Sequence, residues 1–572
     1  MKKVLLLSIL VLAFLFTAAC GEASDNIDAP VDGNDDTTAV EAGNINPGKI
    51  RVKTVEGLNE HIYMTFFKPE SDNYTVSYRL SGTDKFTEID KELIIEDGNS
   101  LECYILGLAK GRYDVRIECG EGDNFARATI ASIDVEKQDR SGYASFNREE
   151  GIGGYNSDGT VKDGAKIIYL TNANKNTVTL DIGGTTYTGI VEILKANKTM
   201  AEPLIIRVMD NITTNQWTPS EEKIRQVDFS AADESYFAGL FSDQYGDNVA
   251  GLTGSVSSKK EGKLYQFITT ADGIKMTETV DAEIASDGCG MNMLEIYDAS
   301  NITIEGIGEK AGFFQFGVAF YYSDSIEIKN LTIEQYPVNA LGFYALDKAD
   351  VHGGYWIHHN TFTIGNNTWG IGSSRTGEET IEMVDVNSIT VSYNKFDQVA
   401  KAATLGDADG GACIDITFHH NYYNRVEQSV PFVRNTNMHS YNNYYERCFR
   451  AISPRTNSYV FGEANYFQNC SGAYYISGGE SWGTIKSFNE VYVESGGTAK
   501  ISVVSDRSEF VENTCMPDGK TDYSKFDTDA KLFYYDVSNK KSDVELMHDV
   551  EELADFVKVY AGAGVSARMM FK

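Results

Sequence analysis

An asparagine recurs seven times in the second half of the chain, each time at the end of a short segment of strand-forming residues. Successive asparagines lie 22 to 34 residues apart, and each preceding segment alternates polar residues with β-branched or aromatic ones. Self-similarity at a period in the twenties is typical of a solenoid, and this residue usage is typical of strands. The series comprises Asn330, Asn360, Asn394, Asn421, Asn443, Asn465 and Asn489, and Gly306 extends it backward. The repeat predicts a β-solenoid.

The asparagines also indicate how the turns stack. An asparagine tolerates the left-handed region and bonds neighbouring backbone through its amide, so residues stacked about 4.8 Å apart can form a ladder. An aromatic residue follows two positions after five of them, at Phe362, Phe396, Tyr423, Tyr445 and Phe467. We expect these rings to stack inside the solenoid. The predicted fold is all-β, a right-handed parallel β-helix preceded by a small β-sandwich.

The N-terminus has the pattern of an export signal. Lys2 and Lys3 precede an apolar run that ends in small residues before Cys20, and the run is short for a membrane span. Thr17 to Cys20 resembles a lipobox, which favours residues 1–20 as a lipoprotein signal peptide with Cys20 lipidated, over simple cleavage. We therefore expect an extracytoplasmic protein, anchored by lipid to a bacterial envelope or secreted.

Charge limits the partners. Residues 21–47 carry seven acids and no base, as expected of a tether, and the whole chain has a formal net charge of −33. Nucleic acid is excluded as a partner because phosphate binding needs a basic surface. An acidic polysaccharide remains possible if a local basic groove or a bridging cation is present, and calcium is the natural cation for an acidic protein.

Three further units follow the linker. Residues 48–136 read as a β-sandwich, in which Leu108, Gly111 and Tyr113 resemble the tyrosine corner of fibronectin type III domains, although a hairpin with a buried tyrosine fits nearly as well. Residues 140–515 form the β-helix, with a short helix near Ile190 at its start and an insertion over 214–290. Residues 516–572 carry an amphipathic helix expected to pack on the β-helix.

The cysteines give no metal-ligand spacing, so zinc is not expected. Eight are present in all. Cys103 and Cys119 fall in the sandwich and could pair. Cys448 and Cys470 lie at equivalent positions of successive repeats, where either stacked thiols or a disulfide could form.

Four segments of the repeat, in this order and spacing, resemble pectate lyases of polysaccharide lyase family 1. They are SITVSYNKF, DITFHHNYY, PFVR and HSYNNYYE, and the resemblance extends over residues 140–500. It implies a parallel β-helix that cleaves polygalacturonate (pectin) by calcium-assisted β-elimination. A fibronectin-like module ahead of the lyase is similar to clostridial members.

The resemblance also implies site residues. Glu378 and Glu382 stand where the family has a pair of calcium-binding aspartates, and Lys401 matches its substrate-binding lysine. Arg434 matches the second arginine of the family's R-x-P-x-x-R motif. Arg455, about one repeat further on, could extend the basic patch. For the paired histidines at 358–359 and 419–420 we expect a structural role.

The family's catalytic base is missing. The first arginine of that motif, which the resemblance assigns as proton acceptor, is Ser429 here. Arg425 and Lys401 are the two candidates for a relocated base. The sequence thus predicts a monomeric, calcium-dependent pectate lyase-like enzyme acting on an acidic polysaccharide. The alternative is a non-catalytic uronan-binding lipoprotein that kept the groove but lost the base.

Overall fold

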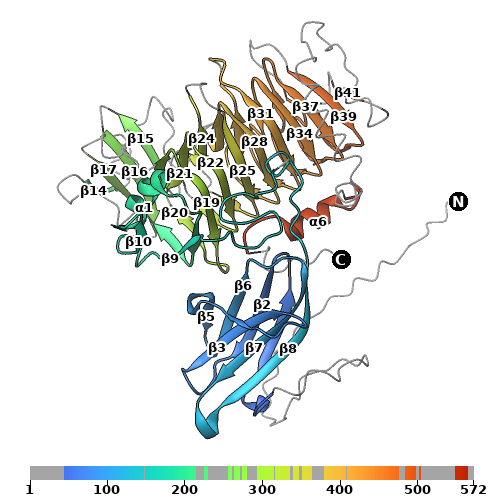
Figure 1. The fold of residues 1–572 in the computed structure, drawn as a ribbon. Coiled ribbons are helices and arrows are strands. Elements are labelled where there is room, and N and C mark those ends of the chain that lie inside the picture. The colour runs from blue at the N-terminus through green and yellow to red at the C-terminus, as the bar shows by residue number, and fades with distance from the viewer. Residues whose placement is uncertain are drawn as a thin grey trace, which may run out of the picture.

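The computed structural model describes residues 44–564 apart from 214–223, 230–254, 280–292, 347–350, 364–378, 506–547 and several shorter gaps. The predictions for the signal peptide, Cys20, most of the acidic linker and Glu378 lie outside the described residues. Two larger units are visible, a small sandwich and a long coil of strands (Figure 1). Among the described helices, none is long and apolar enough to cross a membrane.

The N-terminal unit consists of two antiparallel four-stranded sheets packed face to face. One sheet has the order β1 (Val52–Gly57), β2 (His61–Phe67), β6 (Ser100–Leu106) and β5 (Ile94–Asp97). The other has the order β4 (Thr87–Glu88), β3 (Tyr74–Leu80), β7 (Gly111–Cys119) and β8 (Ala126–Val135). The Tyr113 hydroxyl donates to the carbonyl of Ala109 at 2.9 Å. The predicted small sandwich is therefore present, and its assignment to fibronectin type III stays a prediction.

The larger unit is a parallel β-helix, as predicted. Three parallel sheets run along it, and the chain passes from one sheet to the next in every turn, or rung. The eleven-stranded sheet contains β9 (Lys166–Leu170), β12 (Leu204–Val208), β19 (Ser300–Gly306), β22 (Asp324–Lys329), β25 (His352–His358), β28 (Val386–Ser392), β31 (Cys413–His419), β34 (Thr436–Tyr441), β37 (Tyr459–Glu463), β39 (Thr484–Phe488) and β41 (Ser502–Val503).

The other two sheets have shorter strands. The nine-stranded sheet contains β13 (Asn211–Thr213), β20 (Gly312–Phe314), β23 (Thr332–Glu334), β26 (Thr361–Thr363), β29 (Lys395–Asp397), β32 (Tyr422–Asn424), β35 (Tyr444–Glu446), β38 (Tyr466–Gln468) and β40 (Val491–Val493). The seven-stranded sheet contains β18 (Met293–Tyr297), β21 (Gly317–Tyr321), β24 (Asn339–Tyr344), β27 (Glu379–Val384), β30 (Ala403–Leu405), β33 (Phe432–Val433) and β36 (Ser453–Pro454). This last sheet carries the candidate site on its outer face.

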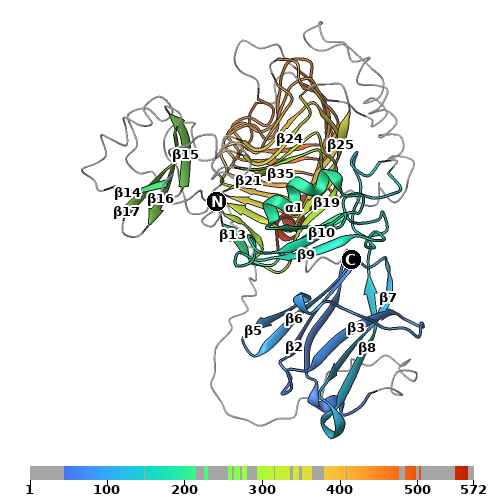
Figure 2. The same ribbon diagram turned by 60° about the vertical axis from the view of Figure 1, so that its left-hand side comes forward.

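Helices and hairpins cover the coil. Helix α1 (Ile190–Ala196) lies across the first rung and buries its apolar side there, as predicted, after the hairpin of β10 (Thr179–Ile182) and β11 (Thr185–Thr188) (Figure 2). Such a cap protects strand edges that would otherwise pair with other chains. Helix α6 (Leu553–Tyr560) packs its apolar face against the nine-stranded sheet.

The predicted insertion contains a sheet of its own. Its strands pair antiparallel in the order β14 (Ile224–Phe229), β17 (Gly273–Thr279), β16 (Lys263–Thr270) and β15 (Ser255–Lys260). No strand of this sheet pairs with the β-helix in the described residues.

The asparagine ladder exists, and it is shorter than the sequence series. Five buried asparagines bond one another amide to amide from rung to rung. The ladder ends on Glu490, whose Oε1 accepts from the Asn465 amide at 2.8 Å. The members are Asn360, Asn394, Asn421, Asn443 and Asn465.

Asn330 and Asn489 do not belong to the ladder, which corrects the sequence series. Lys329 pairs with His358, so Asn330 is level with His359 rather than with the next asparagine. The same one-residue offset applies to Asn489, and both adopt left-handed backbone, with φ of 56° and 52°. They occupy the position before the ladder residue, where asparagine also tolerates positive φ.

The predicted aromatic stack fills the core. Successive rings lie 4.5–5.3 Å apart, centroid to centroid, and the stack continues to Tyr492, two residues after Glu490. Its predicted members are Phe362, Phe396, Tyr423, Tyr445 and Phe467.

The structure records the described cysteines as free and buried. Cys103 and Cys119 lie on different sheets of the sandwich, and the predicted pairing is not made. Cys448 and Cys470 are stacked thiols, which decides between the two alternatives left open by the sequence.

A cationic pocket on the seven-stranded sheet

A pocket of about 290 Å³ opens on the outer face of the seven-stranded sheet, over β27, β30, β33 and β36. Four cationic side chains and one carboxylate line it, so it carries an excess of three positive charges within a strongly acidic chain. Its lining residues are Glu379, Lys401, Thr404, Gln428, Ser429, Phe432, Arg434, Arg450, Ser453, Arg455 and Tyr475.

The strand register explains why these residues meet. In a parallel β-helix, equivalent positions of successive rungs align about 4.8 Å apart. Thr404 pairs with Phe432, and Phe432 pairs with Ser453, so three rungs contribute to one outer face. The predicted residues Lys401, Arg434 and Arg455 are brought together here.

An aromatic ring orients two of the arginines. The guanidinium carbons of Arg434 and Arg455 lie 4.3 and 5.0 Å from the centroid of the Phe432 ring. Cation–π contacts of this kind restrict the position of a guanidinium. Arg455 is 6% exposed, which makes it a built feature of the pocket rather than a solvated surface arginine.

Lys401 is paired with a carboxylate that the sequence analysis did not single out. Its Nζ lies 2.9 Å from Oε1 of Glu379, which is 8% exposed. Burial raises the pKa of Glu379 to about 7, although Lys401 and Thr404 favour its charged form. A carboxyl that titrates near neutrality sets the net charge of this pocket, because Lys401 is neutralised only while Glu379 is ionised.

Ser429 lines the pocket and Arg425 does not. Ser429 is 6% exposed and bonds the preceding rung through its backbone carbonyl. Arg425 is exposed at the turn after β32, with its backbone in the left-handed region. Of the two predicted substitutes for the missing base, only Lys401 therefore lies in the pocket.

Glu382 lies beside the pocket, because it pairs with the pocket residue Thr404 on the adjacent strand. Its Oε2 accepts from the Tyr344 hydroxyl at 2.6 Å and from the Asn339 amide at 2.7 Å. Gly342 makes this arrangement possible, since a Cβ there would lie 2.5 Å from the Tyr344 ring.

The described residues do not by themselves form a calcium site. Calcium takes six to eight oxygen ligands, whereas Glu379 is bound to Lys401 and one oxygen of Glu382 already has two donors. Glu378, the other predicted ligand, lies outside the described residues. Calcium therefore stays a prediction, and no chemical step is derived through it.

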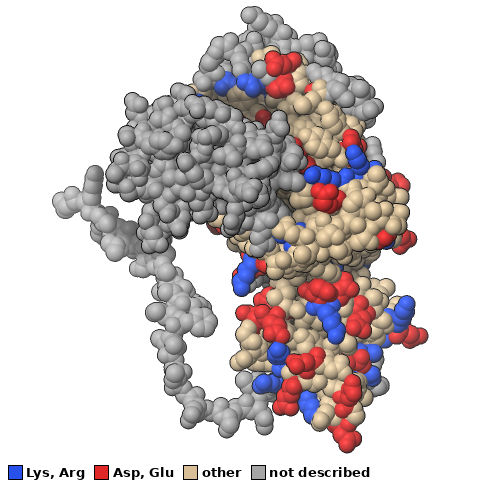
Figure 3. Space-filling view, turned by 90° about the vertical axis from the view of Figure 1, so that its left-hand side faces the viewer, with Lys and Arg blue, Asp and Glu red and all other residues tan. Residues whose placement is uncertain are grey.

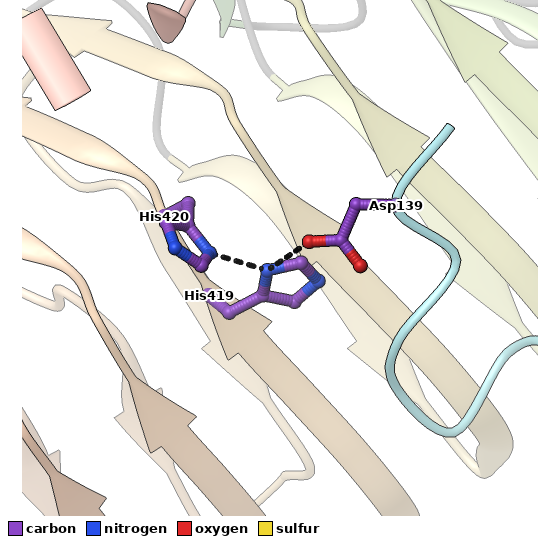
Figure 4. A group of neighbouring side chains, drawn as sticks. All are labelled: Asp139, His419 and His420. Atoms are coloured by element: carbon purple, nitrogen blue, oxygen red, sulfur yellow. Dashed lines mark hydrogen bonds and ion pairs between the residues drawn. The ribbon is translucent and has the colours of Figure 1, made fainter. Parts of the chain in front are cut away.

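A second group of titratable side chains lies at the end of β31, in the eleven-stranded sheet. Asp139, His419 and His420 are fully buried where the segment after the sandwich meets β31 (Figure 4). Asp139 accepts from the Tyr393 hydroxyl at 2.8 Å and from Ser141. The sequence analysis missed Asp139 because only the fold brings it to the histidines.

Hydrogen bonding fixes the protons of these histidines. Burial lowers the pKa of His419 to about 4, so its ring is neutral at pH 7, and its Nε2 faces the Ser141 carbonyl and must carry the proton. His420 then donates through Nδ1 to Nδ1 of His419 at 2.9 Å, and its Nε2 accepts from His548. These partners satisfy both rings without an ion, consistent with the predicted structural role.

The pair His358 and His359 repeats this arrangement. The two Nδ1 atoms lie 2.8 Å apart, and Nε2 of His358 faces Glu327. Between the two pairs, Tyr393 stacks on His359 and on His420 at 4.9 and 4.7 Å, centroid to centroid. The histidines therefore act as part of the stacked wall of the coil.

Charged side chains of both signs cover the surface of the sandwich. On the face in Figure 3, acidic and basic side chains are interspersed over the sandwich, with no single-sign region. The pocket, with four cations and one carboxylate, has the opposite sign to the net charge of the whole chain, which is −33.

The chain is thus a parallel β-helix protein with a cationic pocket, and it is similar to several known proteins. Residues 248–477 match the family profile described as pectate lyase. Pectate lyase 3 of Pectobacterium carotovorum is 27% identical over 199 residues, which is 33% of this chain and 51% of that protein. Pectate lyase C of Dickeya chrysanthemi is 27% identical over 195 residues, or 32% and 50%. The chain thus spans about half the length of these relatives.

Solved structures are similar over a longer stretch. A pectate lyase of Bacillus sp. N165 in complex with trigalacturonate covers 74% of this chain and 99% of its own, at 20% identity and a TM-score of 0.42. Pectate lyase C from Erwinia chrysanthemi with Ca²⁺ covers 76% and 98%, at 18% identity and a TM-score of 0.42.

Proposed function

We propose that this protein binds polygalacturonate in the cationic pocket and cleaves it by β-elimination. The observation that carries the proposal is the pocket itself, where Arg434, Arg450, Arg455 and Lys401 converge in an otherwise acidic chain. A uronan presents one carboxylate per sugar, and guanidinium groups bind carboxylates with two parallel hydrogen bonds. The match of residues 248–477 to the pectate lyase profile supports the same substrate class.

The elimination step needs a base and a cationic surface. The base takes the proton from C5, the C–H electron pair forms the C4=C5 double bond, and the C4–O bond breaks. The departing glycosidic oxygen keeps that bond's electrons and takes a proton from water. Negative charge develops on the adjacent carboxylate, where the arginines stabilise it. Lys401 is the candidate base that lies inside the pocket, where its Nζ contacts Glu379.

The direct test is an ultraviolet assay of the unsaturated product on polygalacturonate, with and without calcium. Absorbance that grows with time and is lost in Lys401→Ala supports the elimination. Its absence at every pH and calcium concentration contradicts the enzymatic reading.

The alternative is a binding protein that retains the pocket without cleaving its ligand. The observation in its favour is Ser429, a side chain that cannot act as a base without an activating partner. Binding of trigalacturonate without an unsaturated product would establish this alternative.

Calcium binding at Glu382 is a separate prediction. A ligand that binds only the folded state raises the melting temperature, so we expect calcium to do so in the parent chain and to do so less in Glu382→Gln. Glutamine keeps an oxygen for Tyr344 and Asn339 and removes the charge. Glu494→Ala, an exposed control, should respond as the parent does. An equal calcium shift in Glu382→Gln would rule this residue out.

Glu379 gives the pocket a defined pH dependence. Its pKa is raised to about 7, so below that pH it is protonated and the pocket gains one positive charge. Uronate carboxylates stay ionised there, and we expect affinity for trigalacturonate to rise several-fold, up to about tenfold, as pH falls from about 8 to about 6. Glu379→Gln should bind tightly with no such dependence. Titration calorimetry measures both, and the same slope in parent and variant would contradict the assignment.

We also propose an envelope location through Cys20, on the sequence of the N-terminus alone. Metabolic labelling with a fatty acid, lost in Cys20→Ala, tests it. A monomer is the proposed state, measurable by light scattering.

A further inference from the structure

Arg450 lines the pocket, although the sequence analysis did not single it out. Phe432 pairs with Ser453 and Val430 donates to the carbonyl of Ala451, so Arg450 is level with Ser429 on the next rung. Equivalent positions of adjacent rungs lie about 4.8 Å apart. The rung that follows Ser429 thus has an arginine, Arg450, at the position equivalent to Ser429.

The side chain reaches back toward the rung of Ser429. Nη1 of Arg450 lies 3.3 Å from Oε1 of Gln428, the residue before the serine. The Tyr475 ring supports it from the following rung, with its centroid 4.5 Å from the guanidinium carbon. Contacts on both sides therefore direct the guanidinium into the pocket.

Arg450 also has hydrogen-bonding capacity to spare. Its Nε is buried and has no acceptor among the described residues, and none of the salt bridges recorded in that part of the chain involves Arg450. A buried N–H without an acceptor is unfavourable, and a ligand oxygen that accepts from it removes that cost. Among the other pocket cations, Lys401 is bound to Glu379, whereas Arg434 and Arg455 lie against an aromatic ring as Arg450 does.

We propose that Arg450 binds the carboxylate of the uronate in this pocket, supplying from the neighbouring rung the guanidinium that position 429 lacks. The inference rests on the proposed function, because it takes a uronan as the ligand. It assigns Arg450 to direct substrate contact. During elimination, this contact stabilises the negative charge that develops on the carboxylate as the C5 proton leaves.

The matched variants are Arg450→Ala and Arg447→Ala. Arg447 is exposed, lies three residues earlier on the same rung and does not line the pocket, so both variants lose one positive charge. With trigalacturonate as the calorimetric probe, Arg450→Ala should bind at least tenfold more weakly, while Arg447→Ala should bind as the parent does. Equal affinities in parent and Arg450→Ala would overturn the proposal.

Rescue distinguishes a shared position from a general charge effect. Ser429 has a left-handed backbone, with φ of 56°. Serine and arginine both carry a Cβ, so Ser429→Arg introduces no backbone strain that the parent lacks. In the Arg450→Ala background it should restore most of the lost affinity. If Ser429→Arg restores nothing while Arg450→Lys does, charge alone acts and the shared position is wrong.

Failure of the proposed function gives a different pattern. Binding of trigalacturonate that depends on Arg450, without unsaturated product in any variant, sinks the elimination and leaves the carboxylate contact standing. No binding by the folded parent sinks both. Thermal melting of each variant shows that it is folded.

Discussion

Asn443→Ala is expected to lower the free energy of unfolding by about 3 kcal/mol. Its Oδ1 accepts from both the backbone and the amide of Asn421, at 3.0 and 2.9 Å. Its amide donates to the carbonyl of Phe418 at 2.8 Å and to Asn465 at 3.1 Å. All these groups are buried. Alanine therefore leaves several of them without a partner, which costs more than one exposed hydrogen bond would.

Urea unfolding at neutral pH measures the effect, with Asn457→Ala as the control. Asn457 is exposed and makes two long contacts, one to Asn435 and one from the Tyr459 hydroxyl, both at 3.4 Å. Its backbone is left-handed, with φ of 54°, so alanine there should cost roughly 1 kcal/mol, well below the effect at Asn443. The ladder lies on another part of the coil from the pocket, and trigalacturonate affinity should be unchanged in folded Asn443→Ala. A variant of parent stability that no longer binds would contradict a structural role.

The β-helix could be predicted because the same residue type, asparagine, recurs at the equivalent position of successive rungs. Each ladder asparagine bonds the asparagine of the next rung, and the aromatic residue two positions later stacks on its own equivalent there. The two ends could not be placed from the sequence. Asparagine suits both the ladder position and the left-handed position before it, so Asn330 and Asn489 look the same in sequence and differ in register.

The pocket could be predicted in part. Lys401, Arg434 and Arg455 follow from resemblance and spacing, and the structure places all three in one pocket. Arg450 and the ion pair of Glu379 could not be found in that way. The loops of successive rungs differ in length. The pairing between strands, rather than a constant period in the sequence, therefore decides which loop residues lie side by side.

The hydrogen-bond partners of the buried histidines could not be predicted from the sequence either. Their pairing with ladder positions is visible in the sequence, but their partners come from segments more than a hundred residues away. Ser141 and His548 complete the hydrogen bonds of His419 and His420. Only the path of the chain over the coil brings these segments together.

Arg434→Ala is expected to weaken trigalacturonate binding by about 30-fold, since a hydrogen-bonded charge pair is worth roughly 1.5–3 kcal/mol. The guanidinium carbon lies 4.3 Å from the centroid of the Phe432 ring, and the planar fork of N–H groups on a guanidinium matches the two oxygens of a carboxylate. Arg434→Lys keeps the charge and loses the fork, and it should fall between parent and alanine variant. Arg425→Ala tests the other predicted arginine, which is exposed and outside the pocket, and should leave affinity unchanged. Titration calorimetry at one salt concentration compares the four proteins, because ion pairing is screened as salt rises. If Arg425→Ala loses affinity and Arg434→Ala keeps it, the uronate binds elsewhere on the coil and the cationic pocket is not the site.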